Sequence, residues 1–214
     1  MKTNIYNIVI LDQSGSMQSI KTQTINGYNE TVQTIKTAQK KHTETQEHFV
    51  TLVVFDSSEI KTLYDRVPCE KAEELNDRTY QPNACTPLYD AMGMTLTKFR
   101  CSLDENADNR VLVTVITDGE ENSSQEYNGN MIKKLIDELK AKGWVFAYIG
   151  ANQDVEKVAA TISITNVMNF EATYHGTRAM FERQSSSCSR FYDRIADNEC
   201  GTCLQEDFFE EDDK

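Results

Sequence analysis

Five oxygen-bearing side chains have types and spacing that suit a hard metal ion. Three of them stand in the segment Asp12-Gln13-Ser14-Gly15-Ser16, directly after the apolar run 5–11. Thr86 comes later in the chain, and Asp118 follows a second apolar run, 111–116. The set offers two carboxylates and three hydroxyls with no His or Cys. Hard oxygen donors of this kind favour Mg²⁺, Mn²⁺ or Ca²⁺ over zinc.

The low formal charge of this set has a chemical consequence. Only the carboxylates of Asp12 and Asp118 oppose the charge of a divalent ion, because hydroxyl ligands are neutral. The ion would therefore stay a strong Lewis acid, and Mg²⁺ also keeps exchangeable waters in its shell. We expect Gly15 to let the serines beside it turn towards one point, and Asp12 to accept hydrogen bonds from the loop. An outside carboxylate can then complete the coordination.

The pattern Asp12-x-Ser14-x-Ser16 resembles the opening motif of the metal-ion-dependent adhesion site of von Willebrand factor A domains and integrin inserted domains. Thr86 and Asp118-Gly119 match the two later elements of that motif in order and at comparable separation. The resemblance covers roughly residues 5–170, and it is strongest to small intracellular bacterial or phage members.

This resemblance implies roles for the five residues. Ser14, Ser16 and Thr86 would bind the ion directly, and Asp12 and Asp118 would bind it directly or through water. It also implies a protein-binding module without catalysis, whose partner offers a Glu or Asp carboxylate. No catalytic residue and no organic cofactor site are therefore predicted, and Mg²⁺ is the expected ion, with Mn²⁺ or Ca²⁺ as alternatives.

Two other interpretations of the same residues are open. The first is a Mg²⁺-dependent phosphohydrolase of haloacid-dehalogenase type, with Asp12 as the nucleophile. That pattern requires a second Asp where Ser14 stands, and a Lys to offset the phosphate charge. The second is a structural α/β domain in which the hydroxyls only cap helices. A P-loop is excluded, because the chain has no Gly-Lys-Ser or Gly-Lys-Thr run.

The elements that must position these residues alternate between strand and helix. Asp56-Ser57-Ser58 predicts a hairpin that adds an antiparallel edge strand over 59–67. We expect an α/β fold with a doubly wound, mostly parallel six-stranded sheet and helices on both faces, a Rossmann-like arrangement. Ligands of such sheets bind beyond the carboxyl ends of the strands, where Asp12 and Asp118 fall. The other expected strands are 5–11, 49–55, 111–116, 144–149 and 164–170, and the expected helices are 19–40, 86–99, 131–139, 154–161 and 174–195.

The 214 residues suit one α/β domain with extensions. We predict a von Willebrand factor A domain over 1–172, a helical extension over 173–197 and an acidic, disordered tail over 198–214. A net charge of −12 disfavours nucleic acid and anionic membranes as partners. The first residues do not form a secretory signal, and no apolar run reaches membrane-spanning length. We therefore expect a cytoplasmic protein, and a monomer.

The six cysteines are expected to be thiols, because nothing in the sequence indicates an oxidising compartment. Cys200 and Cys203 form the only close pair. Their spacing leaves open a zinc site completed by Cys188 and His175. The absence of a second close pair favours thiols without a metal.

Overall fold

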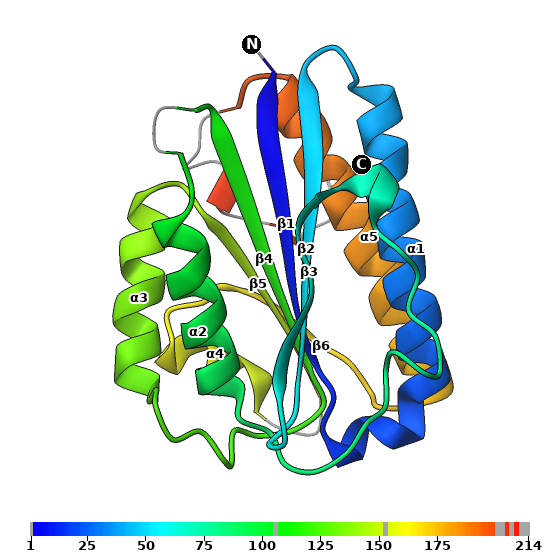
Figure 1. Ribbon diagram of the computed structural model, residues 1–214, viewed down its shortest axis with the longest axis vertical. Coiled ribbons are helices and arrows are strands. Elements are labelled where there is room, and N and C mark those ends of the chain that lie inside the picture. The colour runs from blue at the N-terminus through cyan, green and yellow to red at the C-terminus, as the bar shows by residue number, and fades with distance from the viewer. Residues whose placement is uncertain (1, 105–106, 152–153, 200–203, 206–207, 210–214) are drawn as a thin grey trace.

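The structure is a computed structural model that describes residues 2–104, 107–151, 154–199, 204–205 and 208–209. A six-stranded sheet with strand order β3-β2-β1-β4-β5-β6 runs through its centre (Figure 1). Every neighbouring pair is parallel except β2 and β3, which are antiparallel. The predicted sheet and its antiparallel edge strand are therefore confirmed. The strands are β1 (Thr3–Asp12), β2 (Gln46–Phe55), β3 (Ile60–Pro68), β4 (Asn109–Thr117), β5 (Val145–Gly150) and β6 (Asn166–Asn169).

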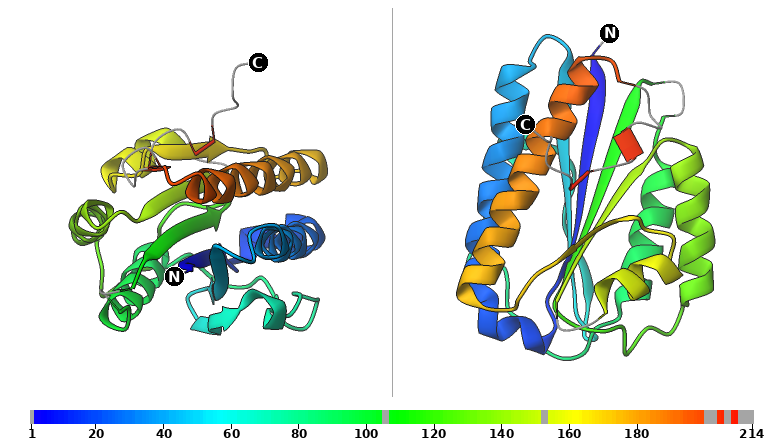
Figure 2. Two further views of the ribbon diagram at one scale, coloured as in Figure 1. Left: turned by 90° about the horizontal axis from the view of Figure 1, so that it is seen from above. Right: turned by 180° about the vertical axis from the view of Figure 1, so that it is seen from behind.

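Helices cover both faces of the sheet, as a doubly wound fold requires (Figure 2). Side chains of α1 and α5 share one apolar cluster with the sheet, and side chains of α2, α3 and α4 share another on the opposite face. The helices are α1 (Lys21–Lys41), α2 (Leu88–Cys101), α3 (Gly129–Ala141), α4 (Val155–Thr161) and α5 (Tyr174–Ala196), with short 3₁₀ helices η1 (Gly15–Ile20) and η2 (Cys69–Lys71).

The apolar run of β1 reflects burial on both sides. Val9 and Leu11 belong to the cluster under α1 and α5, whereas Ile8 and Ile10 belong to the cluster under α2 and α3. Successive strand residues point to opposite faces, so a strand covered on both faces must be apolar throughout. This burial agrees with the central position of β1 in the sheet. Asp12, the last residue of β1, lies at the carboxyl end of the sheet.

Several element bounds differ by one to three residues from the expectation, α2 and β6 among them, whereas α5 agrees with it. Helix α2 begins at Leu88, with Pro87 as its N-cap, so the helix starts two residues after Thr86. Strand β6 is shorter than the apolar run that predicted it. Helix α5 continues through the serines 185–187, because Ser187 is buried and the helix packs along α1. Tertiary packing there overrides the weak helical preference of serine.

The end of the chain contributes to the core next to α5. Leu204, Phe208 and Phe209 are buried in the same apolar cluster as Phe191 of α5. Apart from Gln205, the rest of 200–214 lies outside the described residues, and the proposed division at 172 and 197 stays a prediction. No helix in the described part of the chain has the length and apolar character needed to cross a bilayer.

Candidate metal centre

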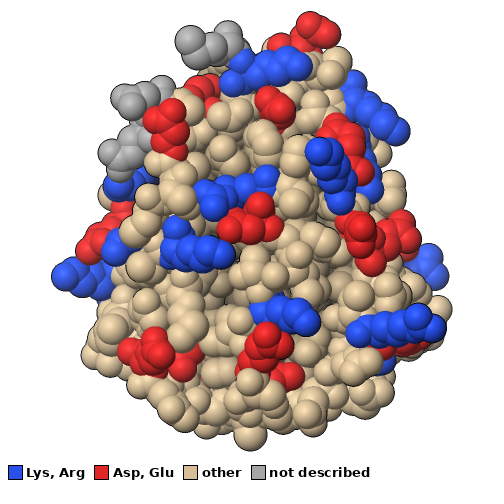
Figure 3. All heavy atoms as spheres, viewed as in Figure 1, with Lys and Arg blue, Asp and Glu red and all other residues tan. Residues whose placement is uncertain are grey.

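The predicted residues lie where β1 and β4 end. These strands are parallel neighbours, with Leu11 opposite Ile116 in the register. Asp12 and Asp118 therefore reach the same edge of the sheet, at the lower end in Figure 1. Figure 3 shows that charged side chains cover the upper and middle parts of this face, and that its lowest part carries none.

Asp12 is fully buried and held on three sides. Its Oδ1 accepts a hydrogen bond from the Ser14 backbone N–H at 2.6 Å, and its Oδ2 accepts one from Thr117 Oγ1 at 2.6 Å. The buried Tyr80 hydroxyl donates to the Asp12 carbonyl oxygen at 2.6 Å. The carboxylate orientation is therefore fixed by the chain, which confirms that loop groups donate to Asp12.

The remaining four residues converge beside Asp12. The hydroxyls of Ser14 and Ser16 lie 3.2 Å apart, and Ser16 Oγ donates to Asp118 Oδ1 at 2.6 Å. A Cβ placed on Gly119 would lie 3.4 Å from Thr86 Oγ1 and 3.6 Å from Ser16 Oγ. One small region thus gathers oxygen atoms from three separate loops, and Gly119 leaves it open.

The hydroxyls do not serve as helix caps. Ser14 occupies the N-cap position of η1, but its side chain makes no capping hydrogen bond. Pro87, rather than Thr86, is the N-cap of α2. The Thr86 hydroxyl makes no hydrogen bond within the described part of the chain, although the residue is buried. The purely structural interpretation is therefore not supported.

Gly15 acts through close approach and not through an unusual backbone conformation. Its φ is not positive, and its N–H donates to the Ala84 carbonyl at 3.0 Å. An added Cβ would lie 3.4 Å from that same oxygen. The absence of a side chain lets the loop after β1 pack against the segment that leads to Thr86.

The electrostatics of the centre favour a cation. Burial raises the pKa of Asp12 to about 6, against the lowering effect of hydrogen bonds from Thr117 and Ser14, and Asp118 raises it further. Burial also raises the pKa of Asp118. The pKa of the Tyr80 hydroxyl is raised first by burial and then by the two carboxylates. Negative charge is thus concentrated in a desolvated place, where a positive ion would stabilise it.

The oxygen spacing fits a small divalent ion. Ligands at about 2.1 Å in an octahedron around Mg²⁺ lie about 3 Å from their neighbours. The Ser14–Ser16 and Ser16–Asp118 oxygen distances of 3.2 and 2.6 Å bracket that value. The donor set therefore suits a hard cation in both chemistry and spacing.

Sequence reasoning missed three supporting residues. Thr117 could have been found, because it ends a strand parallel to β1 and directly precedes Asp118. Tyr80 and Asn122 gave no signal, since Tyr80 stands in an apparent loop and Asn122 in an apparently solvated turn. Their roles become visible only when segments far apart in sequence are brought together.

The zinc alternative does not form as proposed. Cys188 and His175 are thirteen positions apart on α5, which is about 20 Å along a helix. Cys188 is buried, whereas His175 is exposed. Cys200 and Cys203 lie outside the described residues. The cysteines that are described, Cys69, Cys85, Cys101 and Cys188, are free thiols.

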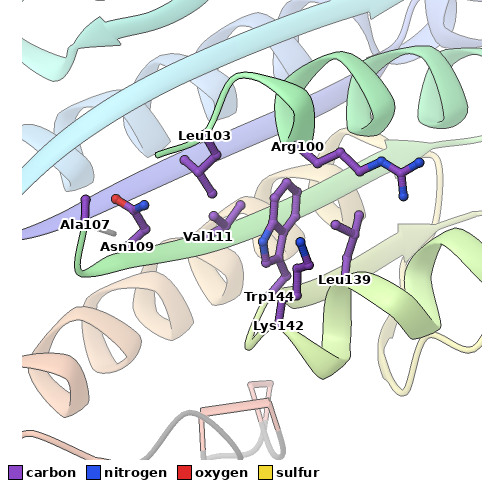
Figure 4. Close-up of a pocket in the computed structure, with 8 residues that line it drawn as sticks. All are labelled: Arg100, Leu103, Ala107, Asn109, Val111, Leu139, Lys142 and Trp144. Carbon is purple, nitrogen blue, oxygen red and sulfur yellow. The ribbon is translucent and has the colours of Figure 1, made fainter. Parts of the chain in front are cut away.

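Hollows also lie outside the centre, and one of about 730 Å³ lies between α1 and α5. A groove of about 480 Å³ flanks the centre and includes Gln13, with both acidic and basic side chains along its walls. A pocket of about 420 Å³ lies at the other end of the sheet, between the ends of α2 and α3 (Figure 4). Its lining residues are Arg100, Leu103, Ala107, Asn109, Val111, Leu139, Lys142 and Trp144.

Among the described residues, no group of three or more His, Cys, Asp or Glu side chains is arranged to hold a metal. The candidate centre differs from such clusters, because three of its five side chains are hydroxyls. The high share of hydroxyl side chains therefore distinguishes this candidate centre from clusters of His, Cys, Asp and Glu.

No protein-family model matches the sequence, and no curated protein matches it. Solved structures do match. Proximal thread matrix protein 1 from the mussel byssus, with a zinc-occupied MIDAS motif, is 11% identical with a TM-score of 0.58 over 88% of this chain. The vWF domain of the type V pili tip protein Mfa5 from Porphyromonas gingivalis is 11% identical, with a TM-score of 0.57 over 89% of this chain. The manganese-loaded TRAP protein of Plasmodium vivax is 17% identical, with a TM-score of 0.52 over 84% of this chain.

The matched regions cover different shares of these proteins. This chain spans 46% of the mussel protein, 71% of the Plasmodium protein and 96% of the pilus domain. The match to an almost complete pilus domain shows that the sheet and its helices together form the shared unit.

Proposed function

We propose that this chain, which has the fold of von Willebrand factor A domains, is a binding module that holds a divalent cation and uses it to capture a carboxylate of a protein partner. The observation that carries the proposal is the convergence of three hydroxyls and two carboxylates at the carboxyl end of the sheet. These groups belong to Asp12, Ser14, Ser16, Thr86 and Asp118. That edge is where ligands bind in open α/β sheets.

Each residue has a distinct task in this proposal. Ser14, Ser16 and Thr86 would contribute neutral oxygens to the ion, and Asp118 would contribute charge. Asp12 is engaged by Ser14 and Thr117 through both oxygens, so it would act mainly by holding the loop and bound water. The bound ion would supply an electrophilic position for an outside carboxylate.

We propose Mg²⁺ as the ion, with Mn²⁺ and Ca²⁺ as alternatives, because all donors are hard oxygens. The mussel and Plasmodium proteins carry zinc and manganese in the matching structures. Those ions show that related folds accept more than one metal, and they leave the choice in this chain to its own donor set.

A phosphohydrolase mechanism is less compatible with the geometry. A nucleophilic carboxylate needs a free oxygen facing the phosphorus atom. Asp12 is 0% exposed, and hydrogen bonds engage both of its oxygens. Ser14 occupies the position where that enzyme class requires a second acid. Binding without catalysis is therefore the proposed activity.

Calorimetric titration with Mg²⁺ and Mn²⁺ tests the metal site. We expect one ion to bind the wild-type protein, and Asp12→Ala to remove the binding. Asp56→Ala is a matched control, because Asp56 is also a buried acid after a strand and also accepts loop N–H groups. Equal binding by wild type and Asp12→Ala would overturn the proposal.

A second measurement tests capture of a carboxylate. Backbone amide NMR spectra can be recorded as a short capped glutamate peptide is added, with its glutamine counterpart as the control. Adding the glutamate peptide should shift the amide signals of Gly15, Ser16 and Gly119 when Mg²⁺ is already bound. The same addition should leave these signals unchanged when Mg²⁺ is absent. Shifts of the same size with the glutamine peptide, or in the presence of a chelator, would contradict carboxylate capture.

A further inference from the structure

The backbone of Thr86 is fastened to the loop that follows Asp118. Asn122 Oδ1 accepts a hydrogen bond from the Thr86 N–H at 2.9 Å, and the Asn122 N–H donates to the Thr86 carbonyl at 3.1 Å. The Thr86 hydroxyl has no hydrogen bond of its own within the described chain. Its position is therefore set by the backbone, and the backbone is set by Asn122.

Glu121 ties the same loop to the start of α2. Its Oε2 accepts a hydrogen bond from the Tyr89 N–H at 2.8 Å and one from Ser124 Oγ at 2.6 Å. Its Oε1 accepts hydrogen bonds from the N–H groups of Ser123 and Ser124, at 2.9 and 2.7 Å. A carboxylate that bridges a helix N-terminus and a turn in this way joins the two as one unit.

Asp90 completes the connection from the side of the helix. Its carboxylate accepts the N–H groups of Gln125, Glu126 and Tyr127, at 2.7, 2.9 and 2.7 Å. Its own N–H donates to Ser124 Oγ at 3.0 Å. We call Asp90, Glu121 and Asn122 the α2 clamp.

We propose that Glu121 and Asn122 are positioning residues of the metal centre, which hold the Thr86 hydroxyl at a fixed place relative to Asp118. This inference rests on the proposed function. Asp118, Glu121 and Asn122 belong to one short loop, and that loop is hydrogen-bonded to the segment that carries Thr86. Thr86 and Asp118, which are 32 residues apart in the sequence, are thereby held in a fixed position relative to each other.

The neighbouring Glu120 provides the contrast that makes the inference testable. It is exposed and makes no hydrogen bond or ion pair with the described residues. Glu120 and Glu121 carry the same charge on the same loop, but only Glu121 bonds to α2. Removing either charge weakens the general attraction for a cation, whereas only removal of Glu121 disturbs the clamp.

Mn²⁺ affinity, measured by electron paramagnetic resonance, separates the two effects. We expect Glu121→Gln to weaken Mn²⁺ binding about tenfold, as supporting residues around metal ligands commonly do. Glu120→Gln should change it by no more than about twofold, because an exposed charge is screened. Equal losses from the two substitutions would overturn the proposal, because charge alone would then account for both.

A double-mutant cycle tests whether Asn122 acts through Thr86. Asn122→Ala should weaken Mn²⁺ binding about tenfold in the wild-type background. In a Thr86→Val background, which lacks the hydroxyl, it should have almost no further effect. The same loss in both backgrounds would show that Asn122 only supports the fold.

The outcomes for the two proposals are distinguishable. A wild-type protein that binds no Mn²⁺ would refute the metal centre. If the wild type binds Mn²⁺ and the variants Glu121→Gln and Asn122→Ala bind it equally tightly, the positioning role of Glu121 and Asn122 is refuted, whereas the metal centre is not. Circular dichroism of the metal-free variants at the working temperature ensures that only folded proteins are compared.

Discussion

The two ends of the sheet hold regions of opposite character. At the carboxyl end, oxygen atoms from three loops meet beside Asp12 and Asp118, next to a groove of about 480 Å³. At the amino end lies a pocket of about 420 Å³ formed by Trp144, Leu139 and other apolar groups, with the cations Arg100 and Lys142 at its edge (Figure 4). The two hollows have similar volumes, so volume does not distinguish the two ends of the sheet.

The difference lies in how the polar groups are held. Around Asp12 and Asp118, hydrogen bonds from Ser14, Ser16 and Thr117 direct oxygen atoms towards one another. At the pocket, Arg100 instead pairs with Glu138 on the surface of α3 at 3.0 Å. Convergent, preorganised polar atoms are what a ligand site requires, and the carboxyl end supplies them.

The largest expected effect belongs to His48, which lies near the amino end of β2. Its ring bonds to Gln46 at 2.9 Å, and burial is the first cause that lowers its pKa from 6.5 to about 4, with His42 adding to the effect. The unfolded chain binds more protons in this window, so folding stability falls as the pH drops from 6.5 towards 4, by up to about 3 kcal/mol. The raised pKa of Asp12 changes folding stability in the opposite direction over part of this window. The loss due to His48 should therefore be measured by urea unfolding as the pH-dependent difference between the wild type and a His48 variant.

His48→Gln isolates that contribution, and His175→Gln serves as an exposed control. As the pH falls, we expect the free energy of unfolding of the wild type to decrease relative to that of His48→Gln, while His175→Gln follows the wild type. A difference in the free energy of unfolding that does not change with pH would mean that protonation of His48 does not destabilise the folded protein.

The next effect sets the two ends directly against each other. Ser16→Ala removes a proposed ligand and should weaken Mn²⁺ binding by at least about tenfold, or about 1.4 kcal/mol. Arg100→Gln alters the pocket at the other end and should leave Mn²⁺ binding unchanged. Calorimetry on both variants provides the measurement. A larger loss from Arg100→Gln than from Ser16→Ala would reverse the assignment of the functional end.

The smallest expected effect concerns the support beneath Asp12. Tyr80→Phe removes the hydroxyl that donates to the Asp12 carbonyl, and it should cost about 1 kcal/mol of folding stability. Metal binding should weaken only slightly, because the carboxylate keeps its bonds to Ser14 and Thr117. Thermal unfolding and Mn²⁺ titration can be compared on one sample. An unchanged melting temperature would show that the Tyr80 hydroxyl contributes nothing to the loop.

Much of the fold could be predicted because burial leaves periodic traces. The apolar run of β1 and the spacing of Ile25, Tyr28 and Val32 in α1 reported the buried faces directly. Boundaries were less certain, since Pro87 fits either the N-cap or the first turn of α2. The helix expected over 174–195 is present as α5, and its packing along α1 supports the serines in its middle.

The site could be predicted only in part, for a related reason. Asp12, Asp118 and the serines follow strands, so the sheet topology alone brings them together. The supporting groups act across the fold: Tyr80 reaches Asp12 from 68 positions away, and Asn122 reaches Thr86 from 36 positions away. Such long-range partners leave no mark in spacing or composition.

The central claim is that one divalent cation sits among the hydroxyls of Ser14, Ser16 and Thr86. A crystal structure of the Mn²⁺-loaded protein, with anomalous diffraction from the metal, tests it most directly. We expect a single anomalous peak in contact with these hydroxyl oxygens, either touching Asp118 or linked to it by water. A Mn²⁺ peak at any other place in the molecule, with this region empty, would show that these hydroxyls do not hold the cation.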